Sequence, residues 1–217
     1  MYEKLRKDPK IMMLIDKGNR NLEELGYTDH SITHCTIVAQ HAATILRLLG
    51  YDDHMQELAR IAGILHDIGN AINRNHHAES GAILAYCILS KYGMNDEDII
   101  PIVSAIGNHD ESNGGAKDQL SAALIIADKC DVRRNRVRNK DKTTFDIHDR
   151  VNYAVTNSNL KIDPIKHSII LNLTIDNSIC SMYDYFEIFL GRMMMCRKAC
   201  EMLNTNFTLT VNGTNIL

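Results

Sequence analysis

The first 140 residues alternate between apolar stripes with helical spacing and short polar breaks. Leu58, Ile61 and Leu65 recur every three or four residues, and Ile68 extends their stripe. Glycine, asparagine and aspartate punctuate the chain between such stripes. We predict helices over about 10–25, from an N-cap at Thr28 or Asp29 to near Gly50, over 54–68 and 77–92, from about 95 to His109, and over 118–137.

The pattern changes after about residue 140. Ile169, Leu171, Leu173 and Ile175 alternate with Ile170, Asn172 and Thr174, which is the period of a strand, and residues 207–211 follow the same period. Segment 182–203 between them is rich in Met, Phe and Leu and is predicted to be a helix. We therefore expect a mostly α fold. Residues 1–140 would form a helical bundle, and residues 141–217 a small strand–helix–strand (α+β) extension that packs on it and offers a homo-oligomer contact.

Composition excludes several classes of protein. A chain of 217 residues with 45% hydrophobic residues can bury one sizeable core, with or without a small addition. The net charge of −3 gives no support for bulk nucleic-acid binding. The six cysteines show no disulfide-like framework, and no stretch reaches membrane-spanning length. Because the N-terminus also lacks an apolar signal segment, we expect a cytoplasmic protein without membrane association.

The run from Ala62 to Gly69 places His66 beside Asp67 at the end of an apolar helical stripe. Burying an imidazole and a carboxylate there would cost several kcal/mol unless a partner replaces their lost contacts with water. A metal ion compensates both, because it accepts nitrogen and carboxylate oxygen as ligands. For the dipeptide alone, a capped and solvated pair at a helix end is the alternative interpretation.

Further histidines and acids follow in a fixed order along the chain. The fragments are His34-Cys-Thr-Ile-Val-Ala, His66-Asp67-Ile-Gly, His77-Ala-Glu-Ser-Gly-Ala-Ile-Leu, Asn108-His109-Asp110-Glu111 and Ala127-Asp128-Lys129-Cys130-Asp131. Together they resemble the HD-domain superfamily of metal-dependent phosphohydrolases, over roughly residues 28–135. Each fragment is weak by itself, and five in the right order are a strong signal.

The resemblance implies a binuclear centre of divalent transition metal ions. His34, His66, Asp67 and Asp128 would surround one ion. His77 and His109 would hold the second, with Asp67 bridging the two. His66 and Asp67 would be the catalytic pair, Asp67 also helping to position water. Ligation by His and Asp alone suits Fe, Mn, Co, Ni or Zn and does not choose among them.

Polar and cationic residues near these ligands are candidates for substrate binding. The run Arg133–Lys142 is rich in Arg and Lys. If the helix of 118–137 continues past Asp128, Arg133 and Arg134 can bind a phosphate in bidentate fashion, the alternative being a solvated surface. The candidates for substrate binding are Lys129, Arg133, Arg134, Asn70 and Arg74.

The implied function is hydrolysis of a small phosphorylated substrate, a phosphomonoester or a nucleotide, by a metal-bound hydroxide. Asn70 stands where cyclic-dinucleotide phosphodiesterases of this superfamily often carry Lys. The Gly-Tyr-Pro motif of that subfamily is absent after His109, so cyclic-di-GMP hydrolysis is disfavoured. Three alternatives remain: a diiron oxygenase with the same ligands, a single-metal nucleotidase in which His77 and His109 bind phosphate as cations, and a nucleotide-sensing module with little turnover.

Overall fold

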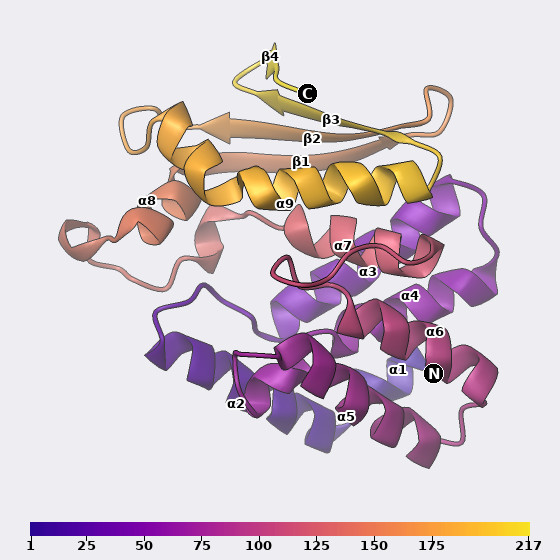
Figure 1. Cartoon of the computed structure of the whole chain (residues 1–217). Coiled ribbons are helices and arrows are strands. Elements are labelled where there is room, and N and C mark those ends of the chain that lie inside the picture. The colour runs from indigo at the N-terminus through magenta and orange to yellow at the C-terminus, as the bar shows by residue number, and fades with distance from the viewer.

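Helices make up the N-terminal part of the computed structural model, which describes all residues from 1 to 217 (Figure 1). They are α1 (Tyr2–Leu5), α2 (Pro9–Glu24), α3 (Ile32–Leu48), α4 (Asp53–Leu65), the 3₁₀-helix η1 (Ile68–Ala71), α5 (His77–Lys91), α6 (Asp96–Gly107) and α7 (Gln119–Lys129). The apolar stripes of these helices face one another and form the core. No helix combines the length and the apolar character that crossing a membrane requires.

Helix α3 begins later than the sequence indicated. Its N-cap is Ser31, whose hydroxyl accepts a hydrogen bond from the backbone N–H of Thr33 at 3.3 Å. Asp29 lies outside the helix, since its backbone N–H donates to the carbonyl of Arg136 at 2.8 Å. Its carboxylate instead accepts the Ser31 hydroxyl at 2.7 Å. The prediction of Thr28 or Asp29 as the N-cap was therefore wrong.

Helix α7 is shorter than predicted and ends at Lys129 rather than near residue 137. The side chain of Arg136 bonds the carbonyl of Asp131, which a longer helix would pair with a backbone N–H. Nη1 of Arg136 donates to the carbonyl of Asp131 at 2.6 Å, and Nε of Arg136 donates to the carbonyl of Asp29 at 2.9 Å. The chain therefore turns away from the α7 axis after Cys130.

The remaining elements form a small sheet with helices around it. They are η2 (Arg134–Arg136), η3 (Lys142–Thr144), α8 (Ile147–Ala154), β1 (Val155–Asp163), β2 (Ser168–Ile175), α9 (Met182–Met202), β3 (Asn206–Val211) and β4 (Thr214–Asn215). The strand order is β1-β2-β3-β4, with β2 and β3 parallel and the two outer pairs antiparallel. The mostly α fold with a small C-terminal α+β part is thus confirmed, whereas α8, β1 and β4 had not been predicted.

Helix α9 connects the parallel strands and lies between the sheet and the helical bundle (Figure 1). Alternate residues of β2, including Ile169, Leu171 and Leu173, are buried and belong to the main core. On its other side α9 packs against α7. One cluster of 52 buried residues includes side chains from both parts of the chain. The division at residue 140 stays a prediction, and the core continues across it.

Gly69 allows η1 to lie directly against the start of α5. A Cβ atom at this position would collide with the carbonyl oxygen of His77 and would stand 2.6 Å from the backbone nitrogen of Gly81. Both obstacles are backbone atoms, which cannot rotate away. Gly69 therefore fixes how closely Asp67 and His77, on either side of this contact, approach each other.

Replacing Gly69 by Ala is expected to lower the free energy of unfolding by about 1–3 kcal/mol, because the added methyl group overpacks a backbone contact. The measurement is urea unfolding at equilibrium. Gly191→Ala is the matched control, since it lies exposed in α9 with nothing within 4 Å of an added Cβ. It should raise stability by up to about 1 kcal/mol. Equal effects of the two substitutions would contradict the close contact.

Candidate metal centre

Helix ends supply all six predicted ligand residues. They are His34 in the first turn of α3, His66 at the C-cap of α4, Asp67 at the start of η1, His77 as the first residue of α5, His109 just after α6, and Asp128 in the last turn of α7. All are buried except Asp128, whose side chain is 12% exposed. The helix packing therefore brings together residues from five separate segments.

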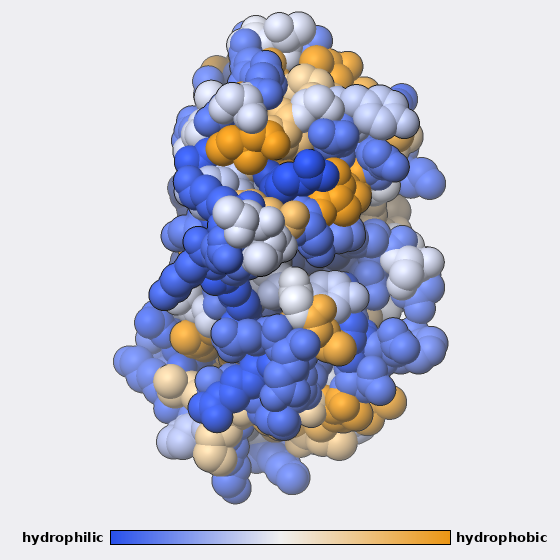
Figure 2. All heavy atoms as spheres, turned by 90° about the vertical axis from the view of Figure 1, so that its left-hand side faces the viewer, coloured by the Kyte–Doolittle hydropathy of each residue, from blue (hydrophilic) through white to orange (hydrophobic).

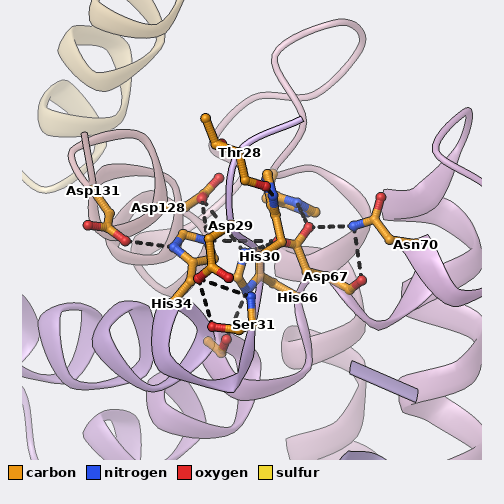
Figure 3. A network of polar contacts seen from close by, with 12 residues as sticks. Thr28, Asp29, His30, Ser31, His34, His66, Asp67, Asn70, Asp128 and Asp131 are labelled. Atoms are coloured by element: carbon orange, nitrogen blue, oxygen red, sulfur yellow. Dashed lines mark hydrogen bonds and ion pairs between the residues drawn. The ribbon is translucent and has the colours of Figure 1, made fainter. Parts of the chain in front are cut away.

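His34 and His66 face the carboxylates of Asp67 and Asp128 (Figure 3). Nε2 of His34 lies 3.3 Å from Oδ1 of Asp128 and 3.7 Å from Oδ2 of Asp67. Nε2 of His66 lies 3.1 Å from Oδ2 of Asp67 and 3.7 Å from Oδ1 of Asp128. Ligand atoms of His34, His66 and Asp128 all lie within 4.8 Å of one another. This spacing suits donors around one ion.

The other oxygen of Asp67 faces a second pair of histidines. Oδ1 lies 3.6 Å from Nε2 of His77 and 3.8 Å from Nε2 of His109. The Nε2 atoms of these two histidines are 3.3 Å apart. Asn70 holds Oδ1 by donating a hydrogen bond of 2.9 Å. The two oxygens of Asp67 therefore point at different groups of imidazoles.

The outer nitrogen of each imidazole has a hydrogen-bond acceptor. An acceptor at Nδ1 favours the tautomer with the proton there and leaves a lone pair on Nε2, as in metal-binding histidines. The Nδ1 pairs are His34 with Oδ2 of Asp131 at 2.7 Å, His66 with the carbonyl of Gly63 at 2.8 Å, His77 with the carbonyl of Arg74 at 3.1 Å, and His109 with the carbonyl of Ile106 at 2.6 Å. All four Nε2 atoms are thereby directed at the cluster.

The inner atoms of the cluster lack partners of their own. Nε2 of His34, Nε2 of His66 and Oδ2 of Asp67 are buried without a hydrogen-bond partner. Lone pairs and carboxylate oxygens that face one another repel unless a cation lies between them. Burial lowers the pKa of His66, but the charges of Asp67 and Asp128 outweigh it and raise this pKa to about 10. The two carboxylates thus favour a positive charge at His66 near pH 7, and a divalent ion would supply that charge in place of the proton.

His77 differs in charge from His66. Burial lowers the pKa of His77 to about 4, against the opposing charge of Asp67. Its ring is therefore neutral near pH 7, as a metal ligand must be. Burial opposes ionisation of Asp67, yet His66 and His109 hold the pKa of this carboxyl well below its usual range. The cluster thus places the neutral imidazole of His77 beside the ionised carboxylate of Asp67.

Comparison with known proteins fits this arrangement of helices and ligands. The family model of the HD domain matches residues 31–135. These residues form an HD domain. This confirms the family resemblance found in the sequence. The match covers all six predicted ligand residues, and Asp128 lies close to its C-terminal end.

The similar proteins include a curated relative and a solved structure. Uncharacterized protein MJ1020 of Methanocaldococcus jannaschii is 28% identical over 172 residues, which cover 68% of this chain and 66% of that protein. This chain therefore spans slightly less than two thirds of that relative. A crystal structure of a predicted HD superfamily hydrolase from an uncultured Thermotogales bacterium is 24% identical. It has a TM-score of 0.44 and covers 57% of this chain and 67% of its own.

The cluster of predicted ligand residues opens into a pocket that no hydrophobic side chain lines. Two of the predicted substrate-binding residues, Arg74 and Lys129, line it. Asn70 lies just behind, buried and hydrogen-bonded to Asp67. The remaining lining residues are Thr28, His30, Asp67, His77, His109, Glu111, Asp128, Arg136 and Arg192. The pocket therefore places four cationic side chains beside the ligand cluster.

The structure does not bring Arg133 and Arg134 into this pocket, contrary to the prediction for both. Arg133 forms an ion pair with Asp131, and its Nη2 donates to Oδ2 of that carboxylate at 3.0 Å. Arg134 packs over the ring of Tyr153 and lines a different pocket. The prediction assumed that α7 continues through residue 137. Because the helix ends at Lys129, the arginine that reaches the pocket is Arg136.

Arg192 was not identified from the sequence, although it reaches the pocket from α9, outside the HD domain. Its Nε donates to Oε1 of Glu111 at 2.9 Å, and Oε2 of Glu111 lies 2.7 Å from Nζ of Lys129. Lys129 in turn lies 2.9 Å from Oδ2 of Asp128. Burial raises the pKa of Glu111, but Lys129 and Arg192 lower it to about 2. These alternating charges hold Lys129 and Arg192 at the wall of the pocket.

Asp131 supports the centre from outside through the 2.7 Å contact with His34. Asp131→Asn is expected to weaken metal binding about 10–100-fold, because a neutral acceptor makes the imidazole a poorer ligand. Competition with a chelator of known affinity measures this change. Asp146→Asn, at the exposed N-cap of α8, is the control and should bind metal as the wild type does. Unchanged affinity in Asp131→Asn would mean that other contacts orient His34.

Proposed function

We propose that this HD-domain protein is a metal-dependent phosphohydrolase that acts on a small phosphorylated substrate, a phosphomonoester or a nucleotide. One observation carries the proposal. The buried His and Asp cluster opens directly into a pocket lined by Arg74, Lys129, Arg136 and Arg192, without a single hydrophobic side chain. Such a lining suits a polyanionic group better than an apolar substrate.

The ligand geometry supports two ions rather than one. His34 and His66 lie near Oδ2 of Asp67 and also face Asp128. His77 and His109 lie near Oδ1 of Asp67. Asp67 would bridge the two groups, and Asn70 would keep its carboxylate in this orientation. When bound, divalent ions supply positive charge that polarises a phosphoryl oxygen and acidifies water near neutral pH.

The protein's own cations orient the substrate in this proposal. Guanidinium groups of Arg74, Arg136 and Arg192 donate paired hydrogen bonds to phosphate oxygens, and Lys129 contributes a compact charge. Glu111 positions Lys129 and Arg192 through its two oxygens. Negative charge that develops on the phosphoryl group therefore meets donors that are already in place.

The same six ligand residues would also serve a diiron oxygenase. The four cations of the pocket favour a phosphorylated substrate over the neutral substrate of many oxidations. A nucleotide-sensing module with little turnover would use the same cations for binding. Turnover therefore separates these alternatives.

The test is phosphate release from a panel of phosphomonoesters and nucleotides. The protein is stripped of metal and reloaded separately with Mn²⁺, Fe²⁺, Co²⁺, Ni²⁺ or Zn²⁺, and oxygen uptake is recorded in parallel. The proposal predicts metal-dependent phosphate release without oxygen consumption. Oxygen uptake without phosphate release would indicate the oxygenase. Binding of a nucleotide with no product from any metal form would indicate the sensing module.

A further inference from the structure

A second and larger pocket lies next to the HD domain, where the segment after α7 meets α8 and the start of β1. Its volume is about 640 Å³, within the range of small-molecule sites. None of its lining residues belongs to the pocket of the metal centre. Hydrophilic side chains cover most of the face of the molecule on which α8 lies (Figure 2). We call this second cavity the basic pocket.

The charges in the basic pocket have one sign. Arg133, Arg134, Lys140 and Lys142 line it, and no carboxylate does. Only Arg133 has an ion pair, with Asp131, so three of the four cations are unpaired. The whole chain carries a net charge of −3, so this concentration of positive charge is local. The remaining lining offers amide and hydroxyl groups and two valines.

Arg134 has polar atoms without partners. Its Nε and Nη2 are buried and make no hydrogen bond within the protein. Unsatisfied donors of a charged group are costly, and a phosphate oxygen is the acceptor that suits a guanidinium best. The structure therefore leaves a donor set that an anionic ligand would complete.

Tyr153 holds two of the cations in place. Cζ of Arg134 lies 4.5 Å from the centre of its ring, and Nζ of Lys142 lies 4.8 Å from the same centre. Cation–π contacts of this kind keep two like charges close together despite their repulsion. The basic pocket is therefore organised for a negative ligand before that ligand binds.

We propose that the basic pocket binds a small polyanion with a phosphate chain, in the class of nucleoside polyphosphates, at a site separate from the metal centre. The phosphate chain would lie against Arg134, Lys140 and Lys142. The amide and hydroxyl side chains, among them Asn157 and Ser158, would meet the sugar hydroxyls. A nucleic acid fits less well, because the cations occupy Tyr153 and leave no free ring for stacked bases.

The wall between the two pockets limits the choice of test residues. Arg136 lines the metal pocket, and Arg134, in the same short helix η2, lines the basic pocket. Arg133 lines the basic pocket but also binds Asp131, which supports His34. A substitution of Arg133 would therefore disturb both sites. Lys140 and Lys142 are exposed and can be reversed in charge without disturbing the core.

The test is a calorimetric titration with inorganic tripolyphosphate, on wild-type protein and on Asp67→Asn, which is expected to lack bound metal. We expect saturable binding in both proteins. Lys140→Glu/Lys142→Glu and, separately, Arg134→Gln should each weaken this binding about tenfold or more in the Asp67→Asn background. The matched control, Lys161→Glu/Lys166→Glu, reverses two exposed lysines outside the pocket and should leave the affinity unchanged.

Three results would overturn the proposal. Binding that disappears in Asp67→Asn would place the polyanion at the metal centre. Binding that falls equally in the pocket variant and in the Lys161/Lys166 control would show general attraction to positive charge. A labelled single-stranded RNA oligonucleotide is titrated in parallel. Tight RNA binding that tripolyphosphate does not displace, with no saturable binding of tripolyphosphate itself, would replace the small ligand by a nucleic acid.

Discussion

Asp67→Asn is expected to abolish both metal binding and phosphate release. The substitution keeps the shape of the side chain and the contact with Asn70, but it removes the negative charge between two groups of imidazoles. Losing an outer hydrogen-bond partner of a ligand already costs about 10–100-fold in affinity, so losing this shared carboxylate should cost more. Metal content after desalting and phosphate release from the best substrate of the panel measure the two effects.

Asp53→Asn is the control for this change. It removes the same charge from the exposed first turn of α4, the helix that ends at His66. The control should retain the metal content and the activity of the wild type. If Asp67→Asn kept both as well, the carboxylate would have no part in binding metal, and the proposed chemistry would be wrong.

Arg192→Met is expected to lower kcat/KM by about 10–150-fold, mostly through a higher KM. The estimate corresponds to the loss of one charge-assisted contact of about 1.5–3 kcal/mol with the substrate phosphate. Met retains most of the apolar stem, so the packing of α9 should survive. Steady-state kinetics with the same substrate give kcat and KM separately.

Arg197→Met is the matched control, because Arg197 lies on the exposed side of the same helix near Glu201. It should leave both kinetic constants unchanged. Equal kinetics in Arg192→Met and the wild type would show that Arg192 only pairs with Glu111. The C-terminal part would then contribute packing and no substrate contact.

The residues of the candidate metal centre could be predicted from the sequence because local patterns mark them. His66 and Asp67 interrupt an apolar stripe, and the fragments around His34 and His77 resemble those of a known family. Helix packing then brings their Nε2 and carboxylate atoms within a few ångströms. Their roles as metal ligands stay predictions. The sequence could not show that the two carboxylate oxygens of Asp67 face different groups of histidines.

The cationic wall of the pocket could not be predicted, because tertiary contacts decide it. Arg136 reaches the pocket only because α7 ends at Lys129, where side-chain hydrogen bonds replace the helical ones. Arg192 lies in a helix rich in Met and Phe, and no sequence signal shows which face of that helix meets the HD domain. A pocket arginine of this kind is found only once the packing of α9 on α7 is known.

The missed strand has a similar explanation. β1, from Val155 to Asp163, is an edge strand that pairs with β2 alone. It is mostly polar, so it lacks the alternation that revealed β2 and β3. Residues such as Thr156 and Ser158 instead line the basic pocket. The homo-oligomer contact expected for this part of the chain stays a prediction.

Metal stoichiometry tests the central claim most directly. It is measured by mass spectrometry on protein purified without chelator or affinity-column metal, for the wild type and for His77→Ala/His109→Ala. The account predicts two ions per chain in the wild type and one in the variant, because only the second group of ligands is removed. One ion in both proteins would contradict the bridged pair of ions, and His77 and His109 would then have to act on the substrate itself.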